Sequence, residues 1–404
     1  MKSAQLHTIN RLLNGRTMEE VFLKVEECKN CKHFSFSKCD LRDELEYCKT
    51  LAVGHCSEWD YSIADRFVDV NDGRIKLVFP TIALLCGGAE RWLVDLATGL
   101  DKKKYCVCIA IEEIKSCDKD LLSRAYDYVD YIVFGRKSLR KVCNAADITL
   151  SWCYFPDSKA KYKVFCSHGC DCWTDKLVEE NRKPDYYFTA VSSVAADPWR
   201  HISNPTIIYN GCDSYRVQST GLDIRKKLRI SNDTILIGFI SRLIPAKNPH
   251  LVAIAAHELR NRGYDARAMF VGDGPATKYD NCIYIPRVEA IGDYLAAMSC
   301  FMLPSDSEAF SLAITEAWIA KVPVVATPVG AIKELEEKHG PMVVRLGTSL
   351  TDAVLLAISD GNRPTVQRAY DISMRNFTKE AMISRWDAYF NELTKAERIV
   401  SVAK

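Results

Sequence analysis

The chain has 404 residues, of which 54 are basic and 52 acidic, so its formal net charge is +2. A chain of this length usually forms two or three domains that each bury a core. The balanced charge gives no support for a generally basic surface that binds nucleic acid or anionic membranes, although a local basic groove is compatible with it. No apolar run could span a bilayer and residues 1–22 lack a signal-peptide core, so we expect a cytoplasmic protein, with peripheral membrane contact left open.

Residues 1–70 differ from the rest, because they are polar and dense in cysteine. Five of the 17 cysteines lie here: Cys28, Cys31, Cys39, Cys48 and Cys56. So short a segment cannot form a sufficient hydrophobic core alone and needs a metal or a cross-link. Four of these thiolates suit a structural zinc ion or, as the second choice, an iron–sulfur cluster. The alternative is a reduced cysteine-rich loop. The other twelve cysteines, between Cys86 and Cys300, are scattered through apolar runs and are expected to be small buried hydrophobes.

Residues 71–213 are predicted to form a parallel α/β domain. The apolar run 74–84 leads into a turn with Gly87 and Gly88, and an amphipathic helix follows. Further short apolar runs, separated by polar or helical stretches, predict strands within 105–113, 126–134, 147–153, 162–168, 186–193 and 205–211.

A second α/β domain is predicted over residues 214–378, after a polar linker near 213–230. Its strands are expected within 233–241, 266–274, 282–288, 300–305 and 322–328, and a helix is expected over 249–263. A last helix is expected within 379–404. Two such domains in tandem imply a cleft between them.

Candidate anion-binding residues follow the first strand of this second domain. Arg242 and Lys247 come just after the strand, where open α/β sheets bind their ligands. An arginine fork and a lysine point charge suit a diphosphate, whereas the alternative is a solvated loop. In the turn "FVGDGP", Gly272 allows close approach of the backbone.

The stretch "SDSEAFSLAITEAW" places two carboxylates eight residues apart. Glu308 is expected in a loop, and a helix that begins near Ser311 would point free N–H groups at a phosphate or a sugar hydroxyl. Glu316 lies more than one turn into that helix on an apolar face, and its alternative interpretation is an ordinary surface glutamate. His168 comes just past a strand end, where a structural role is the alternative to a catalytic one.

The motifs taken together resemble a known family. "GGAERWLVDLATGL", "SHG", "AVSS", "IIYNGCD", "GFISRLIPAKNP", "FVGDGP" and "EAFSLAITEAWIAKVPVVATPVG" occur in this order. Over about residues 74–400 the chain resembles the retaining glycosyltransferases of the GT-B fold, family 4, and the most specific part is Glu-x7-Glu after Arg-x4-Lys. The resemblance implies two Rossmann-like domains facing a cleft, with the last helix crossing back to the N-terminal domain.

Residue roles follow from the same resemblance. Arg242 and Lys247 match the pair that holds the donor diphosphate, Glu316 matches the ribose-binding glutamate, and Glu308 lies near the donor sugar. The resemblance further implies donor contacts from Gly272 and from the backbone N–H groups of Ala309, Phe310, Ser311 and Leu312, a contact of His168 with the transferred sugar, and acceptor-side positions for Gly87 and Gly88.

The implied activity is retaining transfer of a hexose-type sugar from a nucleotide-diphosphate sugar to an acceptor hydroxyl of a glycan, a lipid-linked molecule or a small molecule. No catalytic metal is expected, because Arg242, Lys247 and a helix N-terminus stabilise the leaving phosphate. A UDP-sugar is the favoured donor. A GDP-sugar stays open, because "IYIPRVEAI" departs from the family pattern beside the nucleobase.

Two other functions are compatible with the sequence. One is glycosylation of a modified base in DNA, against which the near-neutral charge counts. The other is a non-catalytic protein that binds a sugar nucleotide, and the joint presence of Arg242, Lys247, Glu308 and Glu316 argues against it.

Overall fold

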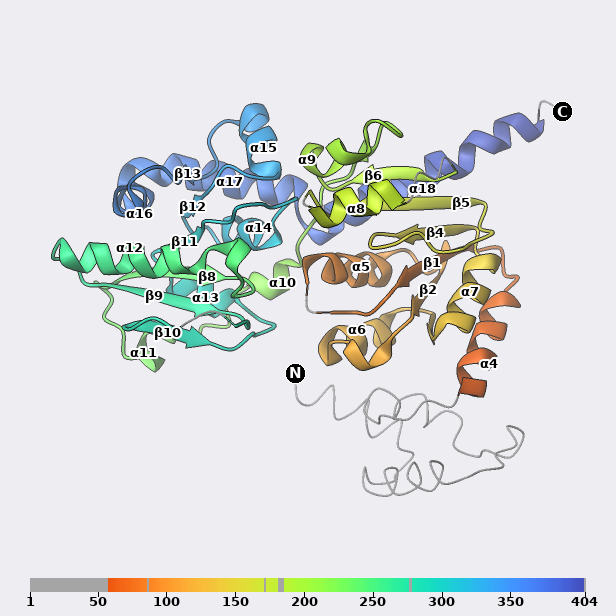
Figure 1. The fold of residues 1–404 in the computed structure, drawn as a ribbon, viewed down its shortest axis with the longest axis horizontal. Helices are drawn as coiled ribbons and strands as arrows, with labels where there is room; N and C mark the ends of the chain where they lie inside the picture. The colour runs from red at the N-terminus through yellow and green to blue at the C-terminus, as the bar shows by residue number, and fades with distance from the viewer. Residues whose placement is uncertain (1–56, 86, 171, 181–184, 276–277, 403–404) are drawn as a thin grey trace, which may run out of the picture. The chain divides into compact units, whose positions relative to one another are not determined.

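The computed structural model describes residues 57–85, 87–170, 172–180, 185–275 and 278–402 (Figure 1). The chain forms two compact units that divide between Lys161 and Tyr162. The predicted domain boundaries near residues 70, 213 and 378 stay predictions. The two sheets nevertheless use separate stretches of chain, since the last strand of one ends at Ile207 and the first strand of the other begins at Ile235.

The first unit is built on four parallel strands in the order β3-β2-β1-β4. The strands are β1 (Ile75–Thr81), β2 (Tyr105–Ile111), β3 (Tyr131–Phe134) and β4 (Ile148–Ser151), and the helices are α4 (Ser57–Val68), α5 (Gly88–Gly99), α6 (Lys119–Tyr128) and α7 (Arg136–Ala145). Every side chain of β2 is buried, as expected for an apolar run in a sheet covered on both faces. Phe67 of α4 and Val142 of α7 pack into the core beside Val78 of β1.

The cysteines whose side chains the structure describes are free. Those that are buried are Cys106, Cys108, Cys143, Cys153, Cys166, Cys212 and Cys300, whereas Cys117, Cys170 and Cys282 are half-buried. Burial raises the pKa of Cys166 to about 12, so that thiol stays protonated. The prediction of small buried hydrophobes is confirmed for the seven buried thiols.

The second unit begins with β5 (Tyr162–Ser167), α8 (Cys172–Glu180), β6 (Tyr187–Ala190), α9 (Ser193–Ala196) and β7 (Thr206–Ile207). These three strands belong to a seven-stranded sheet whose order is β3-β2-β1-β4-β5-β6-β7. Trp199 is fully buried beside Phe165 and Phe188, and its indole N–H donates to the hydroxyl of Ser167 at 3.0 Å.

A six-stranded sheet fills the rest of the second unit, in the order β10-β9-β8-β11-β12-β13. Its strands are β8 (Ile235–Ile240), β9 (Ala266–Val271), β10 (Cys282–Ile285), β11 (Cys300–Leu303), β12 (Val324–Ala326) and β13 (Val344–Arg345). Its helices are α12 (Pro249–Asn261), α13 (Gly292–Ala297), α14 (Leu312–Ile319), α15 (Ala331–His339), α16 (Leu350–Ile358) and α17 (Arg363–Asn376). The strand pairs are parallel and the strand order reverses between β8 and β11, which is the order of a nucleotide-binding Rossmann sheet. The fold is therefore α/β with two Rossmann-like sheets, as predicted.

The polar stretch that the sequence predicts as a linker contains two short helices, α10 (Ser214–Val217) and α11 (Ile224–Lys227). Each begins at an aspartate whose side chain caps it: Asp213 accepts from the N–H of Tyr215 and Asp223 from that of Lys226. A composition-based prediction overlooks such helices because they are only four residues long.

The last helix, α18 (Lys379–Val402), begins where the chain passes residue 212 again. The backbone N–H of Cys212 donates to the carbonyl of Phe377, and the carbonyl of Cys212 accepts from the N–H of Lys379, both at 2.9 Å. Farther along α18, Tyr389 is half-buried near Cys166 of β5 and Tyr187 of β6, and its removal from water raises its pKa. The final helix thus lies beside strands of the seven-stranded sheet (Figure 1).

Candidate functional site

The loops after β8 and β11 lie at the carboxyl edge of the six-stranded sheet. β8 and β11 are paired neighbours, and the strand order reverses between them. In open α/β sheets this switch point leaves a crevice outside the strand ends where ligands bind. The loop after β8 carries Arg242 and Lys247, and the loop after β11 carries Glu308. The fold therefore brings together three residues that the sequence singled out.

Lys247 and Glu308 form a direct ion pair across these two loops. The ammonium Nζ of Lys247 lies 2.7 Å from Oε1 of Glu308, and the two side chains are only 15% and 12% exposed. The same carboxylate oxygen accepts a hydrogen bond from the hydroxyl of Ser305 at 2.8 Å. The exposed guanidinium of Arg242 makes no hydrogen bond or ion pair with any residue that the structure describes. One cation of the predicted pair is thus held by a carboxylate and the other is open to solvent.

The two loops are joined by further hydrogen bonds. Asn248 takes a left-handed conformation, with φ of 48°, and its side-chain amide donates to the carbonyl of Pro304 at 3.0 Å and to Asp306 at 2.6 Å. The N–H of Asp306 donates in turn to the carbonyl of Ala246 at 3.0 Å. Such a cross-linked pair of loops fixes Lys247 and Glu308 before any ligand arrives. The sequence analysis did not identify Asn248, although asparagine before a proline-started helix is the signal that favours this conformation.

Gly272 supports the loop after β8 from the side of β9. Its φ is +148°, and a Cβ at this position would overlap the carbonyl oxygen of Ser241. The next residue, Asp273, accepts through its carbonyl from the N–H of Leu243 at 2.9 Å. The glycine is therefore required by the close approach of two backbones. A contact of Gly272 with a donor stays a prediction.

Residues 309–312 lead from the loop into α14. Ser311 precedes the helix with φ of +71°, an uncommon conformation for a residue other than glycine, asparagine or aspartate. Within the described residues nothing accepts a hydrogen bond from the backbone N–H groups of Ala309, Phe310, Ser311 and Leu312. Strained backbone and free N–H groups at a helix start are features that recur where anions bind.

Glycine and aromatic packing hold this turn in place. A Cβ at Gly330 would overlap the carbonyl oxygen of Glu308, and the N–H of Ala331 donates to the carbonyl of Ala309 at 3.1 Å. Phe310 is buried, and its ring lies 6.0 Å from that of Tyr209 and 5.5 Å from that of Phe377.

Glu316 lies inside α14 and is buried, with an exposed fraction of 4%. Its Oε1 accepts a hydrogen bond from Nε of Arg216 at 2.7 Å, so the carboxylate is compensated by a charge from α10. The alternative interpretation, a surface glutamate, is therefore wrong. The sequence analysis missed Arg216, because nothing in a spacing of 100 residues marks two side chains as partners.

His168 follows β5, and its segment reaches the loop that carries Glu308. The thiol of Cys170 donates to the carbonyl of Glu308 at 3.3 Å. His168 is half-buried, and desolvation of its imidazole lowers the pKa to about 3, so the ring is neutral at physiological pH. A neutral imidazole can donate one hydrogen bond and accept another.

The remaining predicted residues are placed elsewhere. Gly87 and Gly88 lie in the first unit, where Gly87 precedes α5 and Gly88 is its first residue, and a Cβ at Gly87 would overlap the carboxylate of Glu90. The cysteines Cys28, Cys31, Cys39, Cys48 and Cys56 lie outside the described residues. Within the part of the chain that the structure covers, no three His, Cys, Asp or Glu side chains are grouped as metal ligands, and no helix is long and apolar enough to cross a membrane.

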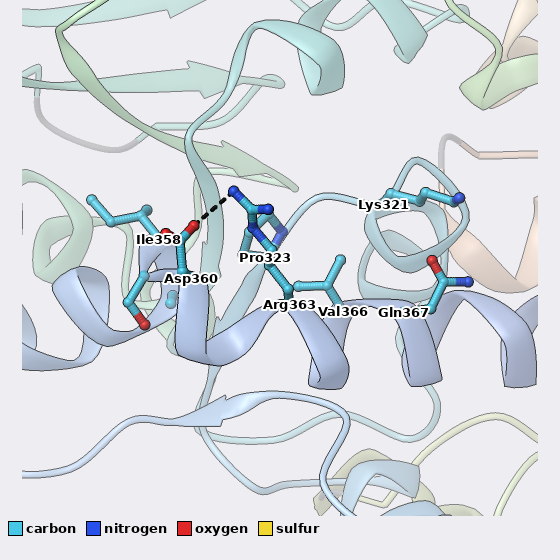
Figure 2. Close-up of a pocket in the computed structure, with 9 residues that line it drawn as sticks. Lys321, Pro323, Ile358, Asp360, Arg363, Val366 and Gln367 are labelled. Atoms are coloured by element: carbon cyan, nitrogen blue, oxygen red, sulfur yellow. Dashed lines mark ion pairs between the residues drawn. The ribbon is translucent and has the colours of Figure 1, made fainter.

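A pocket of about 370 Å³ lies away from these loops (Figure 2). Lys321 and Pro323 line it just before β12, and Ile358, Asp360 and Arg363 line it between α16 and α17. Arg363 and Asp360 form an ion pair of 2.7 Å in which both side chains are largely exposed. Because it faces the amino end of β12, this pocket is at the opposite edge of the sheet from the strand ends where such sheets bind ligands.

Comparisons with known proteins agree with this geometry. The family model described as "Glycosyl transferases group 1" matches residues 234–360, which contain both loops and α14. The putative teichuronic acid biosynthesis glycosyltransferase TuaC of Bacillus subtilis (strain 168) is 32% identical over 134 residues, a match that covers 32% of this chain and spans only about a third (33%) of TuaC. The O-antigen biosynthesis glycosyltransferase WclY of Escherichia coli is 23% identical over 255 residues, covering 59% of this chain and 68% of WclY.

Among solved structures, Anabaena Alr3699/HepE in complex with UDP and glucose superposes with a TM-score of 0.66 at 16% identity, covering 79% of this chain and 100% of that chain. A likeness at this identity establishes the fold. Residues 234–360 are therefore similar to the glycosyl transferases of group 1, and the chain has the GT-B fold.

Proposed function

We propose that this chain is a retaining glycosyltransferase that transfers a hexose-type sugar from a UDP-sugar to an acceptor hydroxyl. The observation that carries the proposal is the ion pair of Lys247 and Glu308 on cross-linked loops at the switch point of the six-stranded sheet, with Arg242 on the same loop as Lys247. The solved structure of Anabaena Alr3699/HepE with UDP-glucose, which shares the fold at 18% identity, supports a uridine donor.

The charges of the site suit a diphosphate that leaves. As the bond between the anomeric carbon and the phosphate oxygen breaks, negative charge grows on the β-phosphate. Arg242 is open to receive one phosphate, and Lys247 exchanges its contact with Glu308 for a second. The free N–H groups before α14 add further donors. This arrangement supplies positive charge from the protein itself, and we propose that the step needs no catalytic metal.

Retention follows from attack on the face from which the diphosphate departs. The acceptor oxygen bonds to the anomeric carbon, and the acceptor proton passes to the leaving phosphate oxygen. Glu308, once released by Lys247, lies close to the donor sugar and stabilises the positive charge that develops there. The neutral imidazole of His168 is proposed to contact the transferred sugar.

The acceptor is proposed to be a glycan, with Gly87 and Gly88 on its side of the reaction. TuaC and WclY are both named for the biosynthesis of polysaccharides, teichuronic acid and O-antigen, which supports this class. A lipid-linked molecule and a small molecule are the alternatives. A turn of two glycines presents little side chain and suits a large, variable partner.

A donor screen tests the proposal. The purified protein is incubated with UDP-glucose, UDP-galactose, UDP-N-acetylglucosamine and GDP-mannose, with and without EDTA, and release of nucleoside diphosphate is measured. We expect release from a UDP-sugar that EDTA leaves unchanged and that Lys247→Ala abolishes. An NMR spectrum of the product assigns the anomeric configuration. No release from any donor, together with no thermal stabilisation by UDP, would contradict the assignment as an enzyme. A product with inverted anomeric configuration would contradict the retaining mechanism.

We also propose a structural zinc site among Cys28, Cys31, Cys39, Cys48 and Cys56, on the strength of their spacing alone. Elemental analysis of the full chain should find about one zinc per chain, and less in Cys28→Ser. Iron with sulfide would identify a cluster instead, and the absence of both metals would contradict the proposal.

A further inference from the structure

Arg216 joins Glu316 to a second segment of the chain. It lies on α10, and its side chain is only 11% exposed. While Nε donates to Glu316, Nη1 donates to the carbonyls of Val288, at 3.4 Å, and of Glu289. The carboxylate of Glu289 lies 3.5 Å from the same nitrogen. One guanidinium thus links α14 with the chain between β10 and α13.

The backbone strengthens this connection. The carbonyl of Arg216 accepts a hydrogen bond from the N–H of Ile291 at 3.0 Å. A Cβ at Gly292 would overlap the carbonyl of Gln218, so α13 starts in close contact with the end of α10. Because the segment 288–292 is fixed to α10 by its main chain, the Arg216 side chain has a rigid base from which to reach Glu316.

The geometry leaves one half of the Glu316 carboxylate open. Oε1 is held by Arg216, whereas Oε2 accepts no hydrogen bond from any residue in the described ranges. The hydrogen bond from Arg216 fixes the plane of the Glu316 carboxylate, so that Oε2 can accept from a hydroxyl of a ligand.

We propose that Arg216 is the positioning residue for ribose recognition, because it holds the Glu316 carboxylate in the orientation that receives the ribose hydroxyls of the donor nucleotide. This inference rests on the proposed donor site. Arg216 itself touches no donor atom, and its effect is confined to the part of the binding energy that the ribose hydroxyls contribute. A structural role alone would weaken every nucleotide equally.

The test compares nucleotides that differ only in a ribose hydroxyl. Binding of UDP, 2′-deoxy-UDP and 3′-deoxy-UDP is measured by calorimetry with the full chain, and the ratio of dissociation constants gives the discrimination. A hydrogen bond to a charged group contributes a factor of about ten or more, so we expect the wild type to prefer UDP over at least one deoxy form by about tenfold. In Arg216→Gln this preference should fall to less than about threefold, and Arg216→Lys, which keeps the charge, should retain part of it.

Arg225→Gln is the matched control. Arg225 is an arginine of the neighbouring helix α11 that donates to the carbonyls of Ala297 and Ser231, at 2.8 and 2.7 Å, and contacts no predicted donor residue. Its loss should lower thermal stability and leave the preference for ribose as in the wild type. Thermal unfolding of each variant verifies that the folded protein is being measured.

The outcomes separate the two proposals. A wild type that binds UDP and discriminates against the deoxy forms, with unchanged discrimination in folded Arg216→Gln, would overturn the inference and leave the donor site standing. A wild type that binds UDP without discriminating would also overturn it. A wild type that does not bind UDP would overturn the donor site and this inference together.

Discussion

The two sheets follow the same strand order, but the loops at their carboxyl edges contain different kinds of residue. In the six-stranded sheet, the loops after β8 and β11 contain paired charges that are hydrogen-bonded to each other. In the first unit, the chain after β1 exposes the apolar side chains of Ile82 and Leu85, at 45% and 49%, before the glycine turn. The same scaffold therefore offers fixed charges at one edge and small or apolar groups at the other.

The difference corresponds to what each edge is proposed to bind. A nucleoside diphosphate has constant charges at constant spacing, which a rigid set of ionic groups can match in advance. An acceptor glycan varies in shape and is mostly uncharged, so a loop of glycine and apolar groups is easier to adapt. We expect substitutions at the apolar edge after β1 to alter transfer alone, and substitutions at the charged edge of the six-stranded sheet to alter donor binding too.

The largest effect is expected for Lys247→Ala, at the charged edge. Loss of an ammonium that stabilises the leaving phosphate should lower transfer by about a hundredfold or more and weaken UDP binding, as measured by initial rates and calorimetry. Lys321→Ala, in the pocket at the opposite edge of the same sheet, is the matched control and should leave both unchanged. Equal activity in the two variants would show that the carboxyl edge of the six-stranded sheet is no more important for transfer than its opposite edge.

Gly272→Ala should cause the next largest change, in stability. The added Cβ would meet the carbonyl of Ser241, and we expect unfolding to become easier by about 3 kcal/mol in urea titrations. Gly263→Ala has a comparable positive φ of +90° but nothing within 4 Å of the new atom, so it should lose only about 1–2 kcal/mol. If both variants lose the same amount, the supporting contact under the β8 loop has no energetic importance.

His168 should make stability depend on pH. Its folded pKa of about 3 lies below the unfolded value of 6.5, so between these values the unfolded chain binds a proton that the folded chain does not. Stability from this residue is therefore complete above pH 6.5 and is lost as the pH falls towards 3, by up to about 2 kcal/mol at pH 5. Urea midpoints between pH 5 and 7 measure the slope, which His168→Asn should reduce. An unchanged slope would show that this imidazole is not sequestered.

The apolar edge is tested by Ile82→Ser and Leu85→Ser. Both side chains are exposed, so stability and UDP affinity should change little, whereas transfer to a glycan acceptor should fall by about tenfold through lost apolar contact. Calorimetry with UDP and transfer assays separate the two readouts. A parallel loss of UDP affinity would contradict the separation of the edges.

The smallest effect is expected for Arg363→Ala. Its ion pair with Asp360 is exposed, and such pairs contribute little in water, so the melting temperature should shift by less than about 2 °C with no change in activity. Differential scanning fluorimetry and the donor assay suffice. A clear loss of activity would indicate that the pocket beside Lys321 takes part in function.

Much of the fold could be predicted from the sequence because its strands are buried apolar runs. Leu77–Phe79 and the whole of β2 lie where periodicity places them, and α12 begins at Pro249 as a proline-started helix should. Hydrophobic periodicity could not predict the four-residue helices α10 and α11, since their only signals are the capping aspartates Asp213 and Asp223.

Within the candidate site too, residues marked by a local sequence pattern could be predicted, whereas residues that depend on tertiary contacts could not. Arg242, Lys247 and Glu308 follow strand ends, and a strand end is visible in the sequence. The partner of Glu316 was not, because Arg216 lies 100 residues away and reaches it only through the packing of α10 on α14. Nor could spacing reveal that Lys247 and Glu308 neutralise each other in the absence of a ligand.

The most direct test of the donor site is a crystal structure of the full chain with UDP. We predict that the diphosphate lies between Arg242 and Lys247, that Lys247 has exchanged Glu308 for a phosphate oxygen, and that the ribose hydroxyls reach Oε2 of Glu316. UDP bound elsewhere, such as in the pocket beside Lys321 and Arg363, with the Lys247–Glu308 pair intact, would contradict the account.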